Sequence, residues 1–256
     1  MTNFHQPLYA YANAKTPEIS LFSVWHFLYI LLIVGGTIWA AFALVRKNEK
    51  TQDSVLKTLA TLLVVTYLGD FFFHPFVYGE LNVDKLPFHL CTFLCPCVAF
   101  AQFNKKFAFA KEAVAVLSIV GSLMYVTYPG SAIGDISPFH YKIVQTFLYH
   151  GLLFAWGVLS AATRRVEFNF KRVWQPLLLI LLIVVWASIG NALYSNEEHH
   201  YDWFFLTGST FPFIPAPLMP LAVIAAVFGM VNIIYGIYYG VCYVIKNKQA
   251  QQKTTA

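Results

Sequence analysis

The sequence predicts an all-α, polytopic membrane protein: a seven-helix transmembrane bundle with its N-terminus outside and its C-terminus in the cytoplasm. Of the 256 residues, 58% are hydrophobic and only 11% are charged, and the mean hydropathy is +0.60. Soluble domains carry about 25% charged residues, so an ordinary soluble domain and a disordered chain are both excluded. The apolar residues also form long continuous runs, whereas the strands of a membrane β-barrel would show alternating apolar and polar residues.

Seven apolar runs follow one another along the chain, most of them near the roughly 20 residues that a membrane helix needs. The first covers about 22–45 and the second about 55–73. The third, 86–103, is shorter and contains Pro96. The others cover about 107–128, 139–162, 173–194 and 218–245. Residues 1–21 are then an extracytoplasmic segment, 22–245 the transmembrane domain and 246–256 a cytoplasmic tail.

Positive charge is distributed unevenly between the two sides of this arrangement. Of the 17 Lys and Arg residues, 14 fall in the tail or in the loops after the first, third and fifth runs. Only Lys15, Lys85 and Lys142 fall on the opposite side. Loops rich in Lys and Arg remain in the cytoplasm, so the N-terminus is expected outside, and an even number of spans would break the alternation. The basic residues are therefore a topology signal, and no nucleic-acid partner is expected.

Ionisable and polar side chains are concentrated in the outer half of the predicted bundle, where all eight histidines lie in or beyond the outer half of a span. Placing an ionisable group near the bilayer centre costs about 2.5–3.5 kcal/mol, so each needs a partner or a function. We expect Asp70 to pair with one of the histidines. The candidate substrate-binding or orienting residues are His26, Asp70, His89, Thr146 and Asn191.

Cys91 and His150 are the predicted catalytic pair within this polar pocket. A thiol among apolar groups is unreactive unless a base or a cation lies beside it. His150 is the deepest histidine, and an imidazole within hydrogen-bond reach would take the thiol proton and activate the sulfur as a nucleophile. The two residues belong to the third and fifth runs, so helix packing must bring them together. The alternative is a packing cysteine and a hydrogen-bonded core histidine.

A metal site is a rival interpretation of the third run, which holds four potential ligands: His89, Cys91, Cys95 and Cys97. Cys91 and Cys95 share a helix face at i, i+4, but His89 and Cys91 face apart, and Pro96 disturbs the helix further. There is no Cys-x-x-Cys pair, so the zinc signal is weak. We expect neither a metal nor a cofactor, and we interpret Cys95 and Cys97 as packing residues at a proline kink.

Four pieces of sequence stand out for their order and spacing. They are Phe22-Ser23-x-x-His26, Leu86-Pro87-Phe88-His89-Leu90-Cys91, Tyr149-His150-Gly151, and Asn191 at the end of the sixth run. In this combination the chain resembles the YwaF family of bacterial integral membrane proteins. The resemblance covers about residues 22–243, and the second and third pieces are its most specific parts.

The YwaF family looks related to a eukaryotic family of membrane acyltransferases that use Cys and His and act on ether phospholipids. This resemblance implies that Cys91 accepts the acyl group and that His150 is its base. A more distant group, the androgen-induced and androgen-dependent membrane hydrolases of fatty-ester lipids, uses Thr and His. Hydrolysis therefore stays open beside acyl transfer.

These observations favour a multi-pass protein of the cell membrane that acts as a lipid acyltransferase or lipid ester hydrolase. Its partners would be membrane phospholipids or fatty-acyl esters, and the oligomeric state stays open. The alternatives are a proton-coupled transporter, with Asp70 and the histidines along its path, and a non-catalytic membrane protein. A transporter would need a polar stripe that continues to the cytoplasmic side, where polar residues in the predicted spans are sparse.

Overall fold

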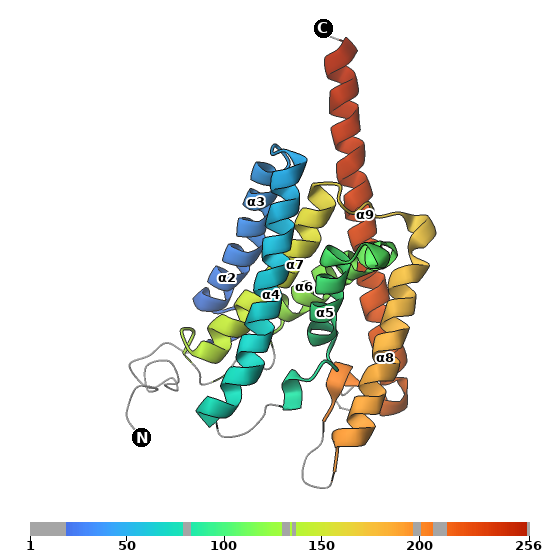
Figure 1. Cartoon of the computed structure of the whole chain (residues 1–256). Helices are drawn as coiled ribbons and strands as arrows, with labels where there is room; N and C mark the ends of the chain where they lie inside the picture. Colours follow the sequence, from blue (N-terminus) through green and yellow to red (C-terminus); the bar gives the residue numbers. More distant parts are fainter. Residues whose placement is uncertain are drawn as a thin grey trace. The chain divides into compact units, whose positions relative to one another are not determined.

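The structure, a computed structural model, describes residues 19–78, 83–129, 134, 137–196, 201–206 and 214–254 and is all-α in this part of the chain. Over the described ranges the only β feature is a single bridge between Ile19 and Gly134. Among the described residues, six helices are long and apolar enough to cross a membrane, and one further apolar helix is shorter. The chain forms two compact units, Met1–Val166 and Glu167–Ala256 (Figure 1).

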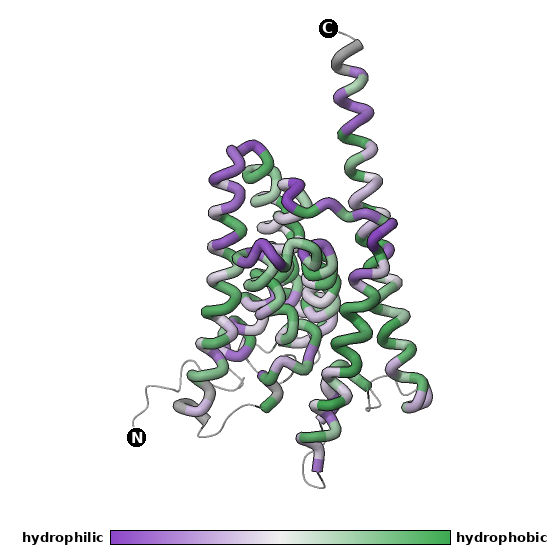
Figure 2. The backbone as a smooth tube through the Cα atoms, turned by 45° about the vertical axis from the view of Figure 1, so that its right-hand side comes forward, coloured by the Kyte–Doolittle hydropathy of each residue, from purple (hydrophilic) through white to green (hydrophobic). Residues whose placement is uncertain are grey.

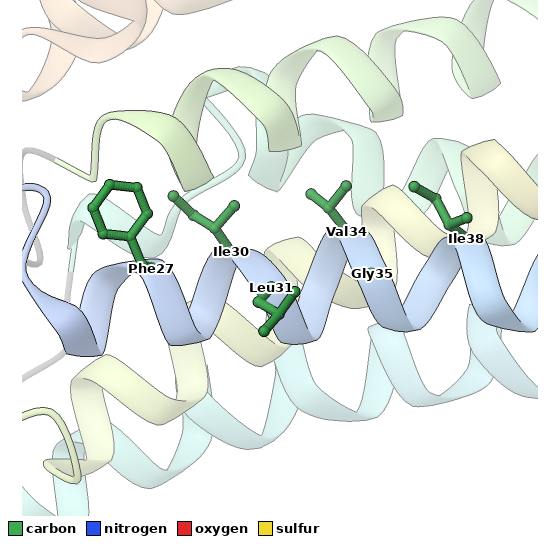
Figure 3. A pocket seen from close by; sticks show the side chains of 6 residues that line it. All are labelled: Phe27, Ile30, Leu31, Val34, Gly35 and Ile38. Carbon is green, nitrogen blue, oxygen red and sulfur yellow. The ribbon is translucent and has the colours of Figure 1, made fainter.

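The first apolar run forms a continuous helical segment with a π-helical turn in its middle. α2 (Val24–Ile30) begins after Ser23, whose side chain accepts a hydrogen bond from the His26 N–H. It continues through η1 (Leu31–Gly35) into α3 (Gly36–Leu44). Such π-helical turns are rare and frequently lie at functional sites. An apolar groove of about 480 Å³ follows this segment, lined by Phe27, Ile30, Leu31, Val34, Gly35 and Ile38 (Figure 3).

α7 (Tyr141–Ala162) is the central helix of the first unit. It packs against α3, α4 (Glu49–Tyr78), α5 (Leu90–Phe103) and α6 (Lys111–Thr127). In the segments that contain α6 and α7, 61% of the residues in the most apolar 18-residue stretch are buried. In the first helix the corresponding share is 11%. Small residues permit the close approach of α6 and α7. A Cβ atom on Gly157 of α7 would lie only 2.7 Å from the Ala115 carbonyl oxygen of α6.

The third predicted span is helical only from Leu90 to Phe103. Pro87 disfavours helical backbone in the residue before it, and His89 is extended (φ −81°, ψ 155°) as the N-cap. The 14 residues of α5 rise about 21 Å, less than the about 30 Å of a bilayer core. α5 is antiparallel to α4, since Gln102 in its last turn donates a hydrogen bond of 3.4 Å to Asp53 near the start of α4.

The second unit contains the last two membrane-length helices. α8 (Trp174–Tyr194) follows the short turn η4 (Phe170–Arg172), and α9 (Met219–Thr254) follows η6 (Ala216–Leu218). α8 and α9 pack against each other, and η5 (Trp203–Phe205) contacts both. The last helix was expected to end near residue 245, but it continues because the residues beyond include no Gly or Pro to stop it.

Hydropathy follows this arrangement along the chain. Figure 2 shows hydrophilic residues at the turn between α3 and α4 and in the last turns of α9. Hydrophobic residues predominate in the middle of these helices. In the first unit, Arg165 after α7 lies at the same end as the start of α4, because its guanidinium donates a 2.9 Å hydrogen bond to the Glu49 carbonyl. Basic residues from distant parts of the sequence therefore meet at one end of this unit.

Candidate functional site

Six of the seven predicted site residues belong to the first unit, and all six lie toward the end opposite Arg165. His26 starts the first helix, Asp70 is in the last third of α4, and Cys91 is in the first turn of α5. His150 and Thr146 lie in α7, where both contact Tyr125 of α6. The seventh, Asn191, lies in the second unit.

Two tyrosine hydroxyls hold the segment that leads into α5. The Tyr67 hydroxyl of α4 donates to the Lys85 carbonyl at 2.7 Å, and the Tyr149 hydroxyl of α7 donates to the Cys91 carbonyl at 2.8 Å. The two tyrosine rings are 6.1 Å apart between their centroids. Thr92 adds a side-chain hydrogen bond of 3.1 Å to the Leu86 carbonyl. The backbone that carries Cys91 is therefore fixed by polar contacts from α4, α5 and α7.

Asp70 pairs with a lysine and a tyrosine, so the expected pairing with a histidine was wrong. Its Oδ2 lies 2.6 Å from the Lys85 ammonium, and its Oδ1 accepts a 3.0 Å hydrogen bond from the Tyr141 hydroxyl. The Asp70 side chain is 6% exposed and the Lys85 side chain 25% exposed. A buried carboxylate needs such partners, and a cation from a loop supplies the charge here. The ion pair fastens the segment before α5 to the outer part of α4.

Cys91 lies in the first turn of α5, after the His89 N-cap, where backbone N–H groups have no partner within the helix. Such groups can donate hydrogen bonds to a nearby acceptor. Its side chain is half-buried, and all four cysteines of the chain are free. One turn further, the buried Cys95 thiol lies within hydrogen-bond reach of the Tyr149 hydroxyl. Tyr149 thus contacts both the backbone of Cys91 and the side chain of Cys95.

His150 is held in a definite tautomer. Its Nδ1 lies 2.7 Å from the Thr146 carbonyl oxygen, and because that oxygen can only accept, Nδ1 carries the proton of the neutral ring. Nε2 then bears the lone pair. The residue is 3% exposed, and Nε2 has no hydrogen-bond partner among the described residues. An unsatisfied buried acceptor costs about 1–3 kcal/mol, so this free base is an exception that needs an explanation.

The link between Cys91 and His150 passes through Tyr149. Within the described ranges no direct hydrogen bond joins the Cys91 sulfur to the His150 ring. Tyr149 directly precedes His150 and bonds the Cys91 carbonyl, and its ring stands edge-on to the imidazole at 87° and 5.4 Å. Catalytic hydrogen bonds are often long before a substrate binds. Tyr149 therefore contacts the Cys91 backbone and the His150 ring, whereas no hydrogen bond joins the two predicted catalytic side chains among the described residues.

His26 and His89 contribute to the architecture of the site. His26 is fully buried, with Nδ1 accepting from the Phe22 N–H at 3.0 Å and Nε2 2.8 Å from the Val126 carbonyl. Both ring nitrogens are occupied, and they connect the start of the first helix to the end of α6. The His89 carbonyl accepts a 3.1 Å hydrogen bond from the Thr92 hydroxyl. That contact defines the first turn of α5, from which Cys91 projects.

In the second unit, Asn191 binds the peptide backbone of Trp203. Its Oδ1 accepts from the Trp203 N–H at 2.8 Å, and its Nδ2 donates to the Trp203 carbonyl at 3.1 Å. Trp203 is 1% exposed, and the next two residues, Phe204 and Phe205, both have left-handed backbones at φ 61° and 57°. Asn191 therefore anchors the connection between α8 and α9 at a strained turn.

The metal alternative gains no geometric support. Over the part of the chain that the structure describes, no group of three or more His, Cys, Asp or Glu side chains is placed to hold a metal ion. Cys91 and Cys95 follow one face of α5 as the spacing indicates, while His89 precedes the helix with an extended backbone.

Four contributors to the site were not predicted from the sequence: Tyr67, Lys85, Tyr125 and Tyr141. Tyr67 and Tyr125 lie in long apolar runs, where an aromatic residue ordinarily faces lipid or the core. Their hydroxyls lie toward the same end of the unit as the histidines. This clustering of polar groups was the signal that could have identified the two tyrosines as site residues. Lys85 was assigned only to a loop, although a lone lysine outside a basic cluster and close to a membrane carboxylate suggests an ion pair.

Together, the membrane-length helices and the buried Cys, Tyr and His side chains define a multi-pass helical membrane protein with a polar cluster near one end of its first unit. Residues 21–238 match the TMEM164 family. The chain therefore belongs to the TMEM164 family, which is a family of membrane proteins. Searches of curated proteins and of solved structures found no match.

Proposed function

We propose that this protein is a membrane-embedded enzyme that transfers or hydrolyses lipid acyl groups, with Cys91 as nucleophile and His150 as general base. The observation that carries the proposal is the buried His150 Nε2, which is a free base in the tautomer set by Thr146. It lies one residue from the tyrosine that bonds the Cys91 carbonyl. A core histidine in a purely structural role would use both nitrogens, as His26 does.

The proposed reaction has two steps that share one proton carrier. His150 Nε2 takes the Cys91 thiol proton as the sulfur attacks an acyl ester carbonyl, and a C–S bond forms while the ester C–O bond breaks. The protonated imidazole returns its proton to the departing alkoxide. In the second step His150 deprotonates an acceptor hydroxyl or water, which attacks the thioester and releases the thiolate. The thiolate then takes the proton back, and the enzyme is regenerated.

The surroundings of Cys91 suit this chemistry. The first turn of α5 offers backbone N–H groups to a thiolate, and the same groups are suitable donors for the oxyanion of the tetrahedral intermediate. The substrates would be membrane phospholipids or fatty-acyl esters, because the cluster is enclosed by helices that face lipid elsewhere. Asn191, a candidate substrate-binding or orienting residue, engages a backbone peptide in its own unit.

The proposal includes seven crossings of the cell membrane, with the N-terminus outside. The antiparallel order of α4 and α5 supports counting the short α5 as a crossing. The collection of basic residues at the end that holds Arg165 supports placing that end in the cytoplasm. Single Lys47→Cys and Lys142→Cys variants test this orientation. Compared with the unmodified protein, only Lys142→Cys should gain labelling by an impermeant maleimide on intact cells, and a gain with Lys47→Cys instead would reverse the topology.

The catalytic assignment is tested with purified protein in vesicles of mixed phospholipids, with acyl transfer and fatty-acid release followed by lipid mass spectrometry. Cys91→Ala and His150→Gln should each abolish turnover. Cys97→Ala is the matched control, since it removes a thiol from the same helix and should retain turnover. If Cys91→Ala and His150→Gln both keep wild-type rates, the assignment is wrong.

A further inference from the structure

We propose that Tyr125 and Thr146 act together as positioning residues that keep the His150 ring in one orientation, with Nε2 as its free base. This inference rests on the function proposed above, in which His150 is the base. Neither residue is assigned a contact with the reacting atoms. Their effect passes entirely through the imidazole.

Three contacts among these residues form a closed arrangement. The Thr146 carbonyl accepts from His150 Nδ1 at 2.7 Å. The Thr146 hydroxyl donates to the Tyr125 hydroxyl oxygen at 3.2 Å. The Tyr125 ring then lies flat on the imidazole, with 3.8 Å between centroids and 5° between the planes. Thr146 therefore contacts both partners of the stack, one through its backbone and one through its side chain.

Each contact restrains a different motion of the histidine. The second torsion of a histidine side chain is broad and roughly two-fold, so a single hydrogen bond leaves the ring free to swing. The Thr146 carbonyl determines which nitrogen keeps the proton, because a carbonyl oxygen can only accept. The Tyr125 face prevents the ring from turning out of its plane. The Thr146 hydroxyl fixes Tyr125 in turn, so that the stack does not depend on packing alone.

The restraint also explains how Nε2 stays without a partner in a buried place. A mobile imidazole would rotate until its buried acceptor found a donor, because unpaired buried polar groups are disfavoured. With the ring held between α6 and α7, Nε2 remains available. Tyr125 lies near the end of α6, where the same helix end accepts a hydrogen bond from His26 through Val126. The position of Tyr125 is therefore itself defined by the first helix.

Paired substitutions at each position separate the side-chain features. Tyr125→Phe keeps the ring, whereas Tyr125→Leu removes it. Thr146→Ser keeps the hydroxyl, whereas Thr146→Val removes it with little change in size. Tyr128→Leu is the control, since it makes the same change three residues later at an exposed position (62% exposed).

Two readouts are used on the full-length protein in detergent or vesicles: steady-state acyl transfer, and ¹⁵N NMR of the histidine rings, with the His150 signal identified by its loss in His150→Gln. The wild type should show His150 protonated at Nδ1 and not at Nε2. Tyr125→Leu and Thr146→Val should lower kcat about 10- to 100-fold, with KM nearly unchanged and with mixed tautomers. Tyr125→Phe removes the same bond between the two hydroxyls as Thr146→Val and should lower kcat to a similar degree, whereas Thr146→Ser should retain most of the rate and Tyr128→Leu should match the wild type.

The inference is overturned if wild-type His150 carries its proton on Nε2, or if Tyr125→Leu and Thr146→Val leave both the tautomer and kcat unchanged. If Tyr125→Leu does not fold, the Thr146→Ser and Thr146→Val pair decides, since these changes are small. The NMR result stands apart from catalysis. The expected tautomer together with full turnover of His150→Gln would support the positioning inference and refute the proposed function.

Discussion

The contact between α6 and α7 gives the sharpest prediction about stability. A Cβ atom at Gly157 would lie 2.7 Å from the Ala115 carbonyl oxygen and 2.8 Å from Ile119 Cγ1, whereas ordinary contacts begin near 3.4 Å. In Gly157→Ala the two helices must therefore separate by about 0.7 Å. Overpacking of this kind costs about 1–3 kcal/mol, and the helix preference of Ala over Gly returns about 0.5–1 kcal/mol. The net expectation is a loss of about 1–2 kcal/mol.

Thermal unfolding in detergent, followed by tryptophan fluorescence, measures this loss. For a chain of this size it corresponds to a fall in Tm of about 2–8 °C. Gly229→Ala is the matched control, because a Cβ at Gly229 meets nothing within 4 Å, and its Tm should stay level or rise slightly. The separation would also loosen the stacking of Tyr125 on His150, so turnover should fall with Tm. A Gly157→Ala protein that unfolds at or above the wild-type temperature would refute the packing argument.

Two further predictions concern the polar contacts. Asp70→Asn leaves the Lys85 ammonium, which is 25% exposed, without its counter-ion. The free energy of unfolding should fall by about 3 kcal/mol, and a double Asp70→Leu, Lys85→Met variant should recover most of the loss. Unchanged thermal unfolding of Asp70→Asn would contradict a structural role for the pair. Asn191→Ala removes both bonds to the Trp203 backbone, each group costing about 1–3 kcal/mol when left unpaired. Proteolysis between α8 and α9 should therefore accelerate, and an unchanged cleavage rate would refute this anchoring.

Much of the fold was predictable because membrane helices depend on composition over many residues. The runs at 22–45, 107–128, 139–162 and 173–194 each correspond to a membrane-length helix. The short length of α5 was only partly predictable: the sequence indicated a short run interrupted by Pro96, but it did not indicate the extended backbone at His89. The π-helical turn of η1 was not predictable, because apolar residues occupy all sides of that helix.

The site was less predictable because it depends on how helices rotate about their axes. Sequence spacing placed Cys91 and His150 in two different predicted spans and could not give the distance between them, and the hydrogen bond from the Tyr149 hydroxyl to the Cys91 carbonyl follows only from helix packing. The Asp70 partner was not predictable from the spans alone, because Lys85 reaches it from the segment before α5. The contact of the Thr146 carbonyl with His150 lies within one helix, but the contact of the Thr146 hydroxyl depends on the position of Tyr125 on another helix.

The most direct measurement of the central claim is the alkylation rate of Cys91 at neutral pH, determined by mass spectrometry of the labelled peptide. The wild-type protein should react at Cys91 several-fold faster than the His150→Gln protein, while Cys97 should react at the same rate in both. Equal Cys91 rates in the two proteins would mean that His150 does not activate the thiol, and the proposed chemistry would fail.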